Sequence, residues 1–362
     1  MPHVTKSCRI NFINAGYVPY PTGGLRVTLE YANFLAAHGH TVTLVFPRHA
    51  SHRNRTPLQA VKSRLWSIKT RLANRPLIPW HSLHPKVRLA LVPELHDRFI
   101  PDADVVVATM WSTATPVAMF ASAKGRKFYL IQGYETWAGP EKEVNATWLL
   151  PLRKIVVSKW LEDIGRGLGA TDMRHIPNGI DLDHFRITNP PAHRAPHVLS
   201  LYHDGELKGV ADALAVLKTY HERFPDIPVS MFGVPERGYE MPAWIKYLRN
   251  PPQTVLVNDF YNKGTIYFGA SVSEGWALPP AEAMACGCTF VGTDSGGVRD
   301  YATHNDTALL AAPRDRTVML RNLIAATEDR ELLQRLQRRG TELIQEFTWQ
   351  RAGTALEQYF LE

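Results

Sequence analysis

The chain has 362 residues, of which 45% are hydrophobic and 21% are charged. This length and composition are typical of a soluble globular protein with two domains of ordinary size, each with its own core. Three cysteines exclude a disulfide framework, and no stretch is apolar enough for a membrane span or a secretory signal, so we expect a cytoplasmic protein.

The net charge of +7 is concentrated in one part of the chain. Between Glu30 and Glu94 there is no acidic residue, whereas ten Lys and Arg residues occur there. Within this part, residues 57–75 carry apolar side chains at helical spacing with Trp66 beside them, which predicts a basic amphipathic helix. The helix either packs on its own domain or makes a peripheral contact with anionic phospholipid at the inner membrane face. Nucleic-acid binding is disfavoured, because no nucleic-acid motif accompanies the charge.

The first half of the chain alternates short apolar runs with amphipathic stretches. We expect a helix at residues 27–38 and strands at residues 10–13, 41–46, 87–92, 105–109 and 127–132. Strands separated by helices predict a parallel sheet, whose ligands bind beyond the carboxyl ends of the strands. The polar, aromatic and glycine residues expected at this edge are Gly23, Gly24, Trp111, Gln132, Tyr134 and Glu135.

The second half repeats the same alternation after a proline-bearing stretch at residues 183–197, which we interpret as the domain boundary. Helices are expected at residues 210–224, after Pro279, after Gly297 and at residues 348–361. The predicted strands are 198–202, 229–232, 254–257, 265–270 and 289–292. The fold class is therefore α/β, with two doubly wound, Rossmann-like domains facing each other across a cleft.

The most informative motif lies between the predicted strand at residues 265–270 and the next helix. Its sequence from Ser273 to Gly287 is SEGWALPPAEAMACG. A strand, a loop and a helix N-terminus in succession direct backbone N–H groups and the positive end of a helix dipole toward one place, which suits a phosphate. Glu274 on the loop and Glu282 about one turn into the helix add acceptors for hydroxyl groups, so the motif predicts a site for a phosphate flanked by polyols.

The two glutamates, with seven residues between them, make this motif resemble the donor-binding signature of family 4 glycosyltransferases. Three further segments resemble the family in the expected order: Gly23-Gly24 with the helix that follows, residues 176–181 and residues 206–209. Members of this family are retaining, nucleotide-sugar-dependent enzymes with the GT-B fold. The resemblance implies an acceptor-side domain at residues 1–182, a donor domain at residues 183–345 and a C-terminal helix at residues 346–362 that crosses back to the first domain.

The resemblance also implies roles for individual residues. Lys208, the Gly24 amide and amides near Gly297 would neutralise the donor's diphosphate, Glu282 would bind the ribose, and Glu274 would bind the transferred sugar. Catalysis would depend on Glu274 and Lys208, without a metal or cofactor. The other expected donor-binding residues are Gly23, His203, Phe260, Tyr261, Gly275, Trp276, Ala277 and Leu278, with the two aromatics in a loop that flanks the base.

Two positions depart from the family's pattern. The family usually has an arginine five residues before the lysine, but this chain has His203, so either the imidazole is protonated beside the diphosphate or backbone amides compensate. Many relatives carry a histidine where this chain has Met110-Trp111-Ser112, which leaves its replacement open. On the same rim, Gln132, Tyr134 and Glu135 form a stretch similar to one in rhamnosyltransferase-like members.

We therefore expect a retaining hexosyl- or deoxyhexosyltransferase. It would move a sugar from a nucleotide-diphosphate sugar to a hydroxyl of a glycan or lipid-linked glycan, as in bacterial surface polysaccharide biosynthesis. Two alternatives stay open: a nucleotide-sugar epimerase or phosphorylase of the same fold, and a non-catalytic nucleotide-sugar-binding protein. The joint presence of Lys208, Glu274 and Glu282 argues against both.

Overall fold

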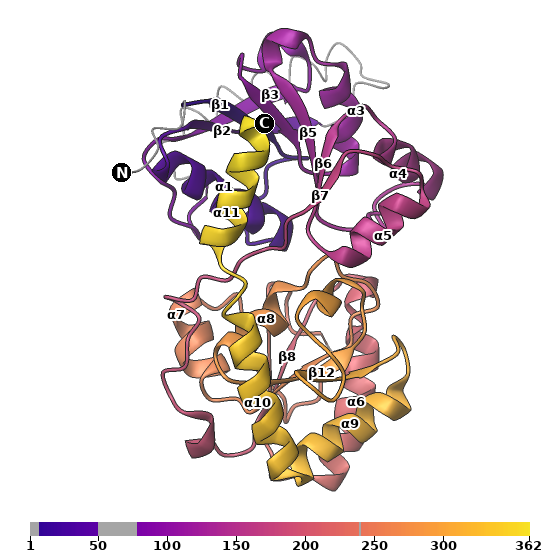
Figure 1. The fold of residues 1–362 in the computed structure, drawn as a ribbon. Coiled ribbons are helices and arrows are strands. Elements are labelled where there is room, and N and C mark those ends of the chain that lie inside the picture. The colour runs from indigo at the N-terminus through magenta and orange to yellow at the C-terminus, as the bar shows by residue number, and fades with distance from the viewer. Residues whose placement is uncertain (1–6, 50–77, 239) are drawn as a thin grey trace. The chain divides into compact units, whose positions relative to one another are not determined.

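The structure, a computed structural model, describes residues 7–49, 78–238 and 240–362. The chain divides into two compact units (Figure 1). The first comprises Met1–Val157, Leu161–Ile176 and Trp349–Glu362, and the second comprises Ser158–Trp160 and Pro177–Thr348. The second unit therefore begins near residue 177, a few residues before the proline-bearing stretch.

A seven-stranded parallel sheet forms the centre of the first unit. In spatial order its strands are β3 (Val87–Glu94), β2 (Thr41–His49), β1 (Arg9–Ile13), β4 (Val105–Ala108), β5 (Arg126–Ile131), β6 (Arg153–Val156) and β7 (Met173–His175). The four residues of β4 are all buried, as expected for a central strand of a sheet covered on both faces. The chain reverses its direction across the sheet between β1 and β4, and this switch point is where ligands of such sheets bind.

Helices of the first unit flank this sheet, and they come from both ends of the chain (Figure 1). They are α1 (Gly23–Ala37), α3 (Trp111–Met119), α4 (Glu141–Trp148), α5 (Lys159–Gly167) and α11 (Trp349–Leu361), with short 3-10 turns at Asp97–Phe99 and Ser122–Lys124. The C-terminal α11 packs on α1, where the rings of Trp349 and Tyr31 lie 5.5 Å apart. A buried contact of 2.9 Å between His40 Nε2 and Glu357 Oε1 also attaches α11 to this unit.

A six-stranded parallel sheet forms the centre of the second unit. Its spatial order is β10 (Lys246–Arg249), β9 (Val229–Gly233), β8 (Val198–Leu201), β11 (Ile266–Gly269), β12 (Thr289–Thr293) and β13 (Ala308–Ala311). Its helices are α6 (Val210–Arg223), α7 (Gln253–Val255), α8 (Leu278–Ala285), α9 (Arg316–Glu328) and α10 (Arg330–Ile344). The switch point of this sheet lies between β8 and β11.

The fold class predicted from the sequence, two Rossmann-like units with parallel sheets, is confirmed. One predicted strand is wrong: residues 254–257 belong to α7 and to the π-helical segment Leu256–Tyr261 that follows it. This apolar run is short, and periodicity alone does not separate a buried strand from a buried helix at that length. The helix expected after Gly297 is only a 3-10 turn, Gly297–Asp300.

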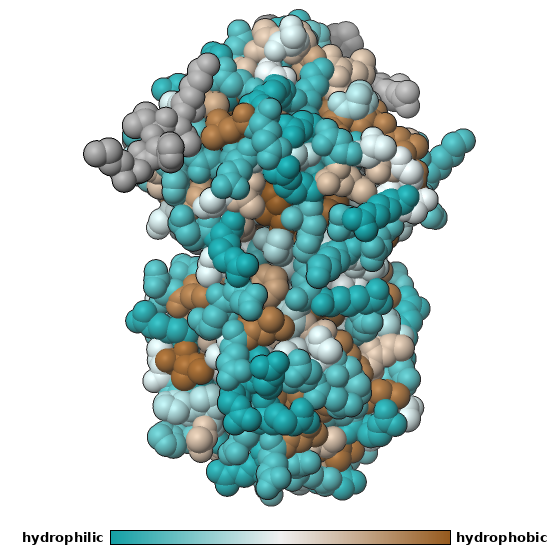
Figure 2. All heavy atoms as spheres, viewed as in Figure 1, coloured by the Kyte–Doolittle hydropathy of each residue, from teal (hydrophilic) through white to brown (hydrophobic). Residues whose placement is uncertain are grey.

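The surface of each unit is largely hydrophilic on the viewed face, because most apolar residues lie in the cores (Figure 2). Figure 2 shows hydrophilic residues over most of the viewed face of each unit, with hydrophobic residues in small scattered groups. Large apolar side chains that remain exposed include Met119, Trp137 and Leu149, and isolated exposure of this kind is ordinary. Among the helices in the described ranges, none combines the length and the apolar character that crossing a bilayer requires.

Candidate active site

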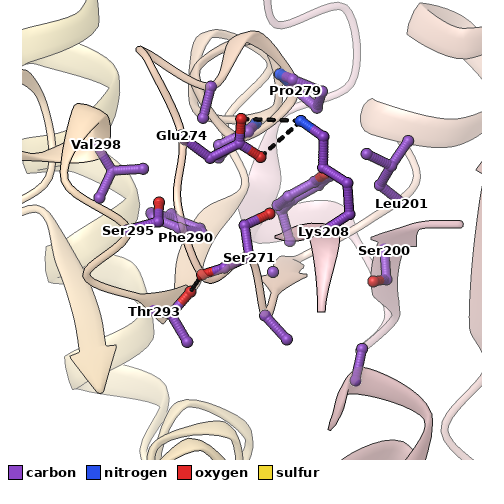
Figure 3. A pocket seen from close by; sticks show the side chains of 16 residues that line it. Ser200, Leu201, Lys208, Ser271, Glu274, Pro279, Phe290, Thr293, Ser295 and Val298 are labelled. Carbon is purple, nitrogen blue, oxygen red and sulfur yellow. Dashed lines mark hydrogen bonds and ion pairs between the residues drawn. The ribbon is translucent and has the colours of Figure 1, made fainter. Parts of the chain in front are cut away.

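A pocket opens in the second unit at the carboxyl ends of β8, β11 and β12, which is the switch point of its sheet. Lys208 and Glu274 face each other in this pocket, with Lys208 Nζ 2.8 and 2.9 Å from the two carboxylate oxygens (Figure 3). The lysine side chain is 31% exposed and the glutamate side chain 12% exposed, so the pair is sheltered but reachable from solvent. A cation and a carboxylate at one place can bind a ligand that carries both a phosphate and hydroxyl groups.

Local backbone geometry explains why Lys208 reaches this position. Lys208 ends the 3-10 turn Glu206–Lys208, and Gly209 follows in the left-handed conformation with φ of 62°. A Cβ on Gly209 would lie 1.9 Å from the carbonyl oxygen of Ala270, at the end of β11. Only glycine allows the turn to approach β11 this closely, which is why a glycine must follow the lysine.

Two segments that line the pocket, the loop at Glu274 and the stretch at Gly296, run side by side. The Glu274 N–H donates to the Ser295 carbonyl at 2.9 Å, and the Gly297 N–H donates to the Glu274 carbonyl at 3.0 Å. A Cβ on Gly297 would lie 2.2 Å from the Gly275 carbonyl oxygen, so glycine is required for this approach as well. The Gly297 amide, which the family resemblance implies would contact a diphosphate, is therefore already hydrogen-bonded within the loop.

The start of α8 also offers fewer donors than the sequence suggests. Leu278, Pro279 and Pro280 form its first turn, and the two prolines have no N–H group. Lys208 is thus the main positively charged group at this pocket. The N-terminus of α8 contributes its helix dipole to the pocket, but it offers few N–H groups that could bond directly to a ligand.

Three residues predicted to bind the donor lie in the core of the second unit. Phe260 and Tyr261 were expected in a loop, but they belong to the π-helical segment and are 1% and 0% exposed. Their rings pack against Phe232, with centroids 5.0 and 6.0 Å from it. Trp276 is 2% exposed. The loop prediction is wrong because these aromatic side chains bury a large apolar area, which outweighs their position near a strand end.

Glu282 is also buried, at 3% exposure, and accepts a hydrogen bond of 3.1 Å from the Tyr261 hydroxyl. Of the residues predicted for the donor, the pocket brings together Lys208, Glu274 and Ala277. The sequence analysis missed the hydroxyl side chains that line the same pocket, which are Ser200, Ser271, Thr293 and Ser295 (Figure 3). Their position at the carboxyl ends of β8, β11 and β12 is the signal that could have found them.

His203 lies next to Lys208 and is more consistent with a neutral imidazole than with a cation. Burial and the nearby Lys208 lower the pKa of His203 below its usual value. Its Nδ1 accepts a hydrogen bond of 2.8 Å from the Gly205 N–H, which leaves Nε2 as the protonated nitrogen. Asp204 Oδ1 lies 3.3 Å from the ring and favours the charged form, but its side chain is 80% exposed and is screened by water.

The switch point of the first unit holds the residues expected on the acceptor side. The N–H of Trp111, the first residue of α3, donates to Glu135 Oε2 at 2.7 Å. Glu135 is 9% exposed, and burial raises its pKa to about 7, although the Trp111 hydrogen bond acts in the opposite direction. Tyr134 is directed to α4 instead, where its hydroxyl donates to Asn145 Oδ1 at 2.9 Å.

Two buried polar atoms at this switch point lack partners among the described residues. Trp111 Nε1 and Gln132 Oε1 are both buried without a hydrogen-bond partner in the described part of the chain. Gln132 also lies beside Gly24, because a Cβ on Gly24 would be 3.5 Å from Gln132 Nε2. That distance is an ordinary contact, Gly23 has open space around it, and neither glycine has a positive φ. Folding therefore does not require glycine at positions 23 and 24.

Two further predictions concern residues 57–75 and the independence from a metal. The basic amphipathic segment at residues 57–75 lies outside the described ranges and remains a prediction from the sequence. Within residues 7–49, 78–238 and 240–362, no three His, Cys, Asp or Glu side chains are grouped as a metal site would need.

Two family descriptions match the chain in succession. Glycosyltransferase Family 4 matches residues 21–184, and Glycosyl transferases group 1 matches residues 185–343. Phosphatidyl-myo-inositol mannosyltransferase from Mycolicibacterium smegmatis is 24% identical over 191 residues. This match covers 50% of the chain and 49% of the mannosyltransferase, so it spans about half the length of that relative.

Solved structures with the same fold cover nearly the whole chain. Sucrose-phosphate synthase from Thermosynechococcus elongatus superposes with a TM-score of 0.72 at 16% identity, covering 97% of this chain and 98% of the synthase. HepE from Anabaena, in complex with UDP-glucose, superposes with a TM-score of 0.71 at 13% identity, covering 97% of this chain and 99% of HepE. At these identities the likeness shows the fold, which is GT-B.

Proposed function

Because the chain belongs to the family 4 and group 1 glycosyltransferases, we propose that it transfers a sugar from a nucleotide-diphosphate sugar to a hydroxyl of a glycan or lipid-linked glycan. The observation that carries the proposal is the contact between Lys208 and Glu274 at the switch point of the second sheet. HepE, which shares the fold, was solved with UDP-glucose, and this supports a nucleotide sugar as donor.

The chemistry follows from the charges that develop during transfer. Cleavage of the glycosidic bond leaves negative charge on the diphosphate, and Lys208 is placed to stabilise it electrostatically. The sugar gains positive charge as the bond breaks, and the Glu274 carboxylate can stabilise that charge and accept a hydrogen bond from a sugar hydroxyl. Donor binding therefore exchanges the contact between Lys208 and Glu274 for two contacts with the ligand.

The two N-terminal glycines support a ligand at the first unit. Neither packing nor backbone conformation requires glycine at positions 23 and 24, so their lack of a side chain is explained by the close approach of a ligand. The unpartnered polar atoms of Trp111 and Gln132 suit the hydroxyl groups of an acceptor. We assign the donor to the pocket of the second unit and the acceptor to the rim of β4 and β5.

The finer assignments complete the proposal. The reaction proceeds with retention of configuration, as in the family. It needs no metal, because Lys208 supplies the positive charge that a divalent cation would otherwise supply. The transferred group is a hexosyl or deoxyhexosyl group. A lipid-linked acceptor is consistent with the relative whose name is phosphatidyl-myo-inositol mannosyltransferase.

A donor screen tests this function. The purified chain is incubated with UDP-, GDP-, ADP- and dTDP-sugars in the presence of EDTA, and thermal stability and release of the nucleoside diphosphate are measured. We expect one donor to raise the melting temperature and to be hydrolysed slowly, and the Lys208→Ala variant to show neither effect. Absence of both effects for every donor in the wild type would contradict the proposal.

The products separate the alternatives. A transferase releases the original sugar or passes it to an added acceptor, an epimerase returns a rearranged nucleotide sugar, and a phosphorylase needs inorganic phosphate. A binding protein would be stabilised by a donor without consuming it. We expect no dependence on added phosphate and no epimerised donor by mass spectrometry and NMR.

A further inference from the structure

Ala277 has a backbone conformation that alanine rarely adopts. Its φ is 58° and its ψ is 84°, in the left-handed region, and it is the N-cap residue of α8. Among the described residues, the other non-glycine positions with positive φ are Asp172, Asn250, Asn305 and Arg314. Asp and Asn reach this region readily because their side chains bond to nearby backbone, but alanine has no such group. Another part of the structure must hold Ala277 there.

One hydrogen bond from a distant residue reaches this position: the Tyr301 hydroxyl donates to the Ala277 carbonyl oxygen at 2.7 Å. Tyr301 is 0% exposed, and its ring lies 4.9 Å from that of Trp276 and 6.5 Å from that of Phe347. Burial raises the pKa of Tyr301 well above its usual value, so the hydroxyl keeps its proton at every pH of interest. The hydroxyl is therefore available as a donor to Ala277, and packing against the rings of Trp276 and Phe347 orients it.

Ala277 lies where the pocket's two functional elements meet. It lines the same pocket as Lys208 and Glu274, and it is followed directly by α8, which carries Glu282. Backbone hydrogen bonds to the Ser295 and Gly297 stretch already fix the loop at Glu274. Three residues later, the left-handed turn at Ala277 sets the direction in which α8 leaves the loop. Ala277 is therefore the residue at which the loop that carries Glu274 turns into α8.

We propose that Tyr301 is a positioning residue of the nucleotide-sugar site, because its hydroxyl holds Ala277 in the left-handed conformation that fixes the Glu274 side of the pocket against the start of α8. This inference rests on the function proposed above. Tyr301 does not line the pocket itself, so it acts on the donor only through Ala277. Without the hydroxyl, the loop spends part of its time in a relaxed conformation that does not bind the donor. The apparent affinity for the donor then falls in proportion to the fraction of molecules whose loop keeps the binding conformation.

The test is a double-mutant cycle with nucleoside diphosphates as probes. Calorimetry on the wild type with UDP, GDP, ADP and dTDP selects the diphosphate that binds best. Tyr301→Phe, which keeps the ring and removes the hydroxyl, is expected to bind it about tenfold more weakly, the usual effect of a lost buried hydrogen bond. Ala277→Gly in the Tyr301→Phe background should restore affinity to within about twofold, because glycine adopts positive φ without strain.

Tyr220→Phe is the matched control, since this fully buried hydroxyl on α6 contacts Thr327 Oγ1 at 2.9 Å, away from the loop. A purely structural role would make Tyr301→Phe behave like Tyr220→Phe, with a lower melting temperature and unchanged affinity. That outcome, or a failure of Ala277→Gly to restore binding, would overturn the inference.

Hydrogen exchange at the amides of residues 275–278 supplies a readout that needs no ligand. We expect faster exchange in Tyr301→Phe than in the wild type, and wild-type exchange rates in Tyr301→Phe would overturn the inference by themselves. If the wild type bound no diphosphate while Tyr301→Phe exchanged faster, the proposed function would fail and the loop-holding role of Tyr301 would stand.

Discussion

Replacing Glu135 with glutamine should stabilise the protein, and the gain should grow with pH. Glu135 follows β5 and is nine-tenths buried against the first residue of α3, and its pKa is about 7 compared with 4.5 for an exposed glutamate. Glutamine is nearly isosteric, and its carbonyl oxygen can still accept the Trp111 N–H. The variant therefore removes the charge while it keeps the hydrogen bond.

The sign and size follow from proton linkage. Between pH 4.5 and 7 the folded state binds the Glu135 proton more tightly than the unfolded state does, so the free energy of unfolding falls as pH rises through this range. The difference between the two pKa values corresponds to about 3 kcal/mol, which is fully lost above pH 7. Glu135→Gln avoids this loss, so it should match the wild type near pH 4.5 and exceed it by about 3 kcal/mol at pH 8.

Urea unfolding at pH 5, 6, 7 and 8 measures the effect, with thermal melts as a second probe. A gain of about 3 kcal/mol corresponds to a rise in melting temperature of about 6–12 °C for a unit of this size. Glu143→Gln, on the exposed face of α4, is the matched control and should change stability little at any pH. A stability difference between Glu135→Gln and wild type that stays flat from pH 5 to 8 would refute the reasoning.

Three further predictions test the proposed site, and a fourth tests the membrane contact expected from the sequence. Lys208→Ala should weaken nucleoside diphosphate binding on the order of 10–100-fold by calorimetry, because a charge-assisted contact is lost, and unchanged affinity would exclude the lysine. Glu274→Gln should lower turnover of the nucleotide sugar more than affinity for the bare diphosphate; equal losses would place Glu274 away from the sugar. Because the pKa of His203 is lowered, diphosphate affinity of the wild type should stay constant from pH 7 to 8.5. His203→Ala should weaken this affinity equally at pH 7 and pH 8.5. A wild-type affinity that falls with rising pH, and that no longer does so in His203→Ala, would show that the imidazole binds as a cation. Residues 57–75 should bind anionic vesicles at low salt, and co-sedimentation should be lost when Lys62, Arg64, Lys69 and Arg71 are changed to Gln; unaffected binding would assign the contact elsewhere.

The sequence predicted the fold because the strands and their order leave strong signals. Runs such as Val105 to Ala108 are uniformly apolar, and the helix at Val210–Arg223 shows a clear apolar face. The weaker strands escaped prediction because they are short and carry charged residues, as in Arg153–Val156 and Lys246–Arg249. Their position in the sheet is decided by pairing with a neighbour, which periodicity does not report.

The pocket could be predicted only in part. The family resemblance assigned Lys208 and Glu274 to the same donor, and their charged atoms lie 2.8 Å apart in the structure. The sequence could not indicate that Phe260 and Tyr261 lie in the core, because the burial of these aromatic side chains depends on partners such as Phe232 on β9. It also gave no signal for Tyr301, whose hydroxyl matters only through the backbone of a residue 24 positions earlier.

Two unfavourable features lie at the switch points of the two sheets. Glu135 is a buried carboxyl at the end of β5, and Ala277 is a left-handed alanine after β11. Glu135→Gln and Ala277→Gly would relieve each by a single substitution without disturbing the packing around it. Selection for stability alone would remove both, since stabilising changes of this kind are readily found. Their location in the residues proposed to bind acceptor and donor is explained if both serve the reaction, because strain and perturbed pKa values are retained where function depends on them.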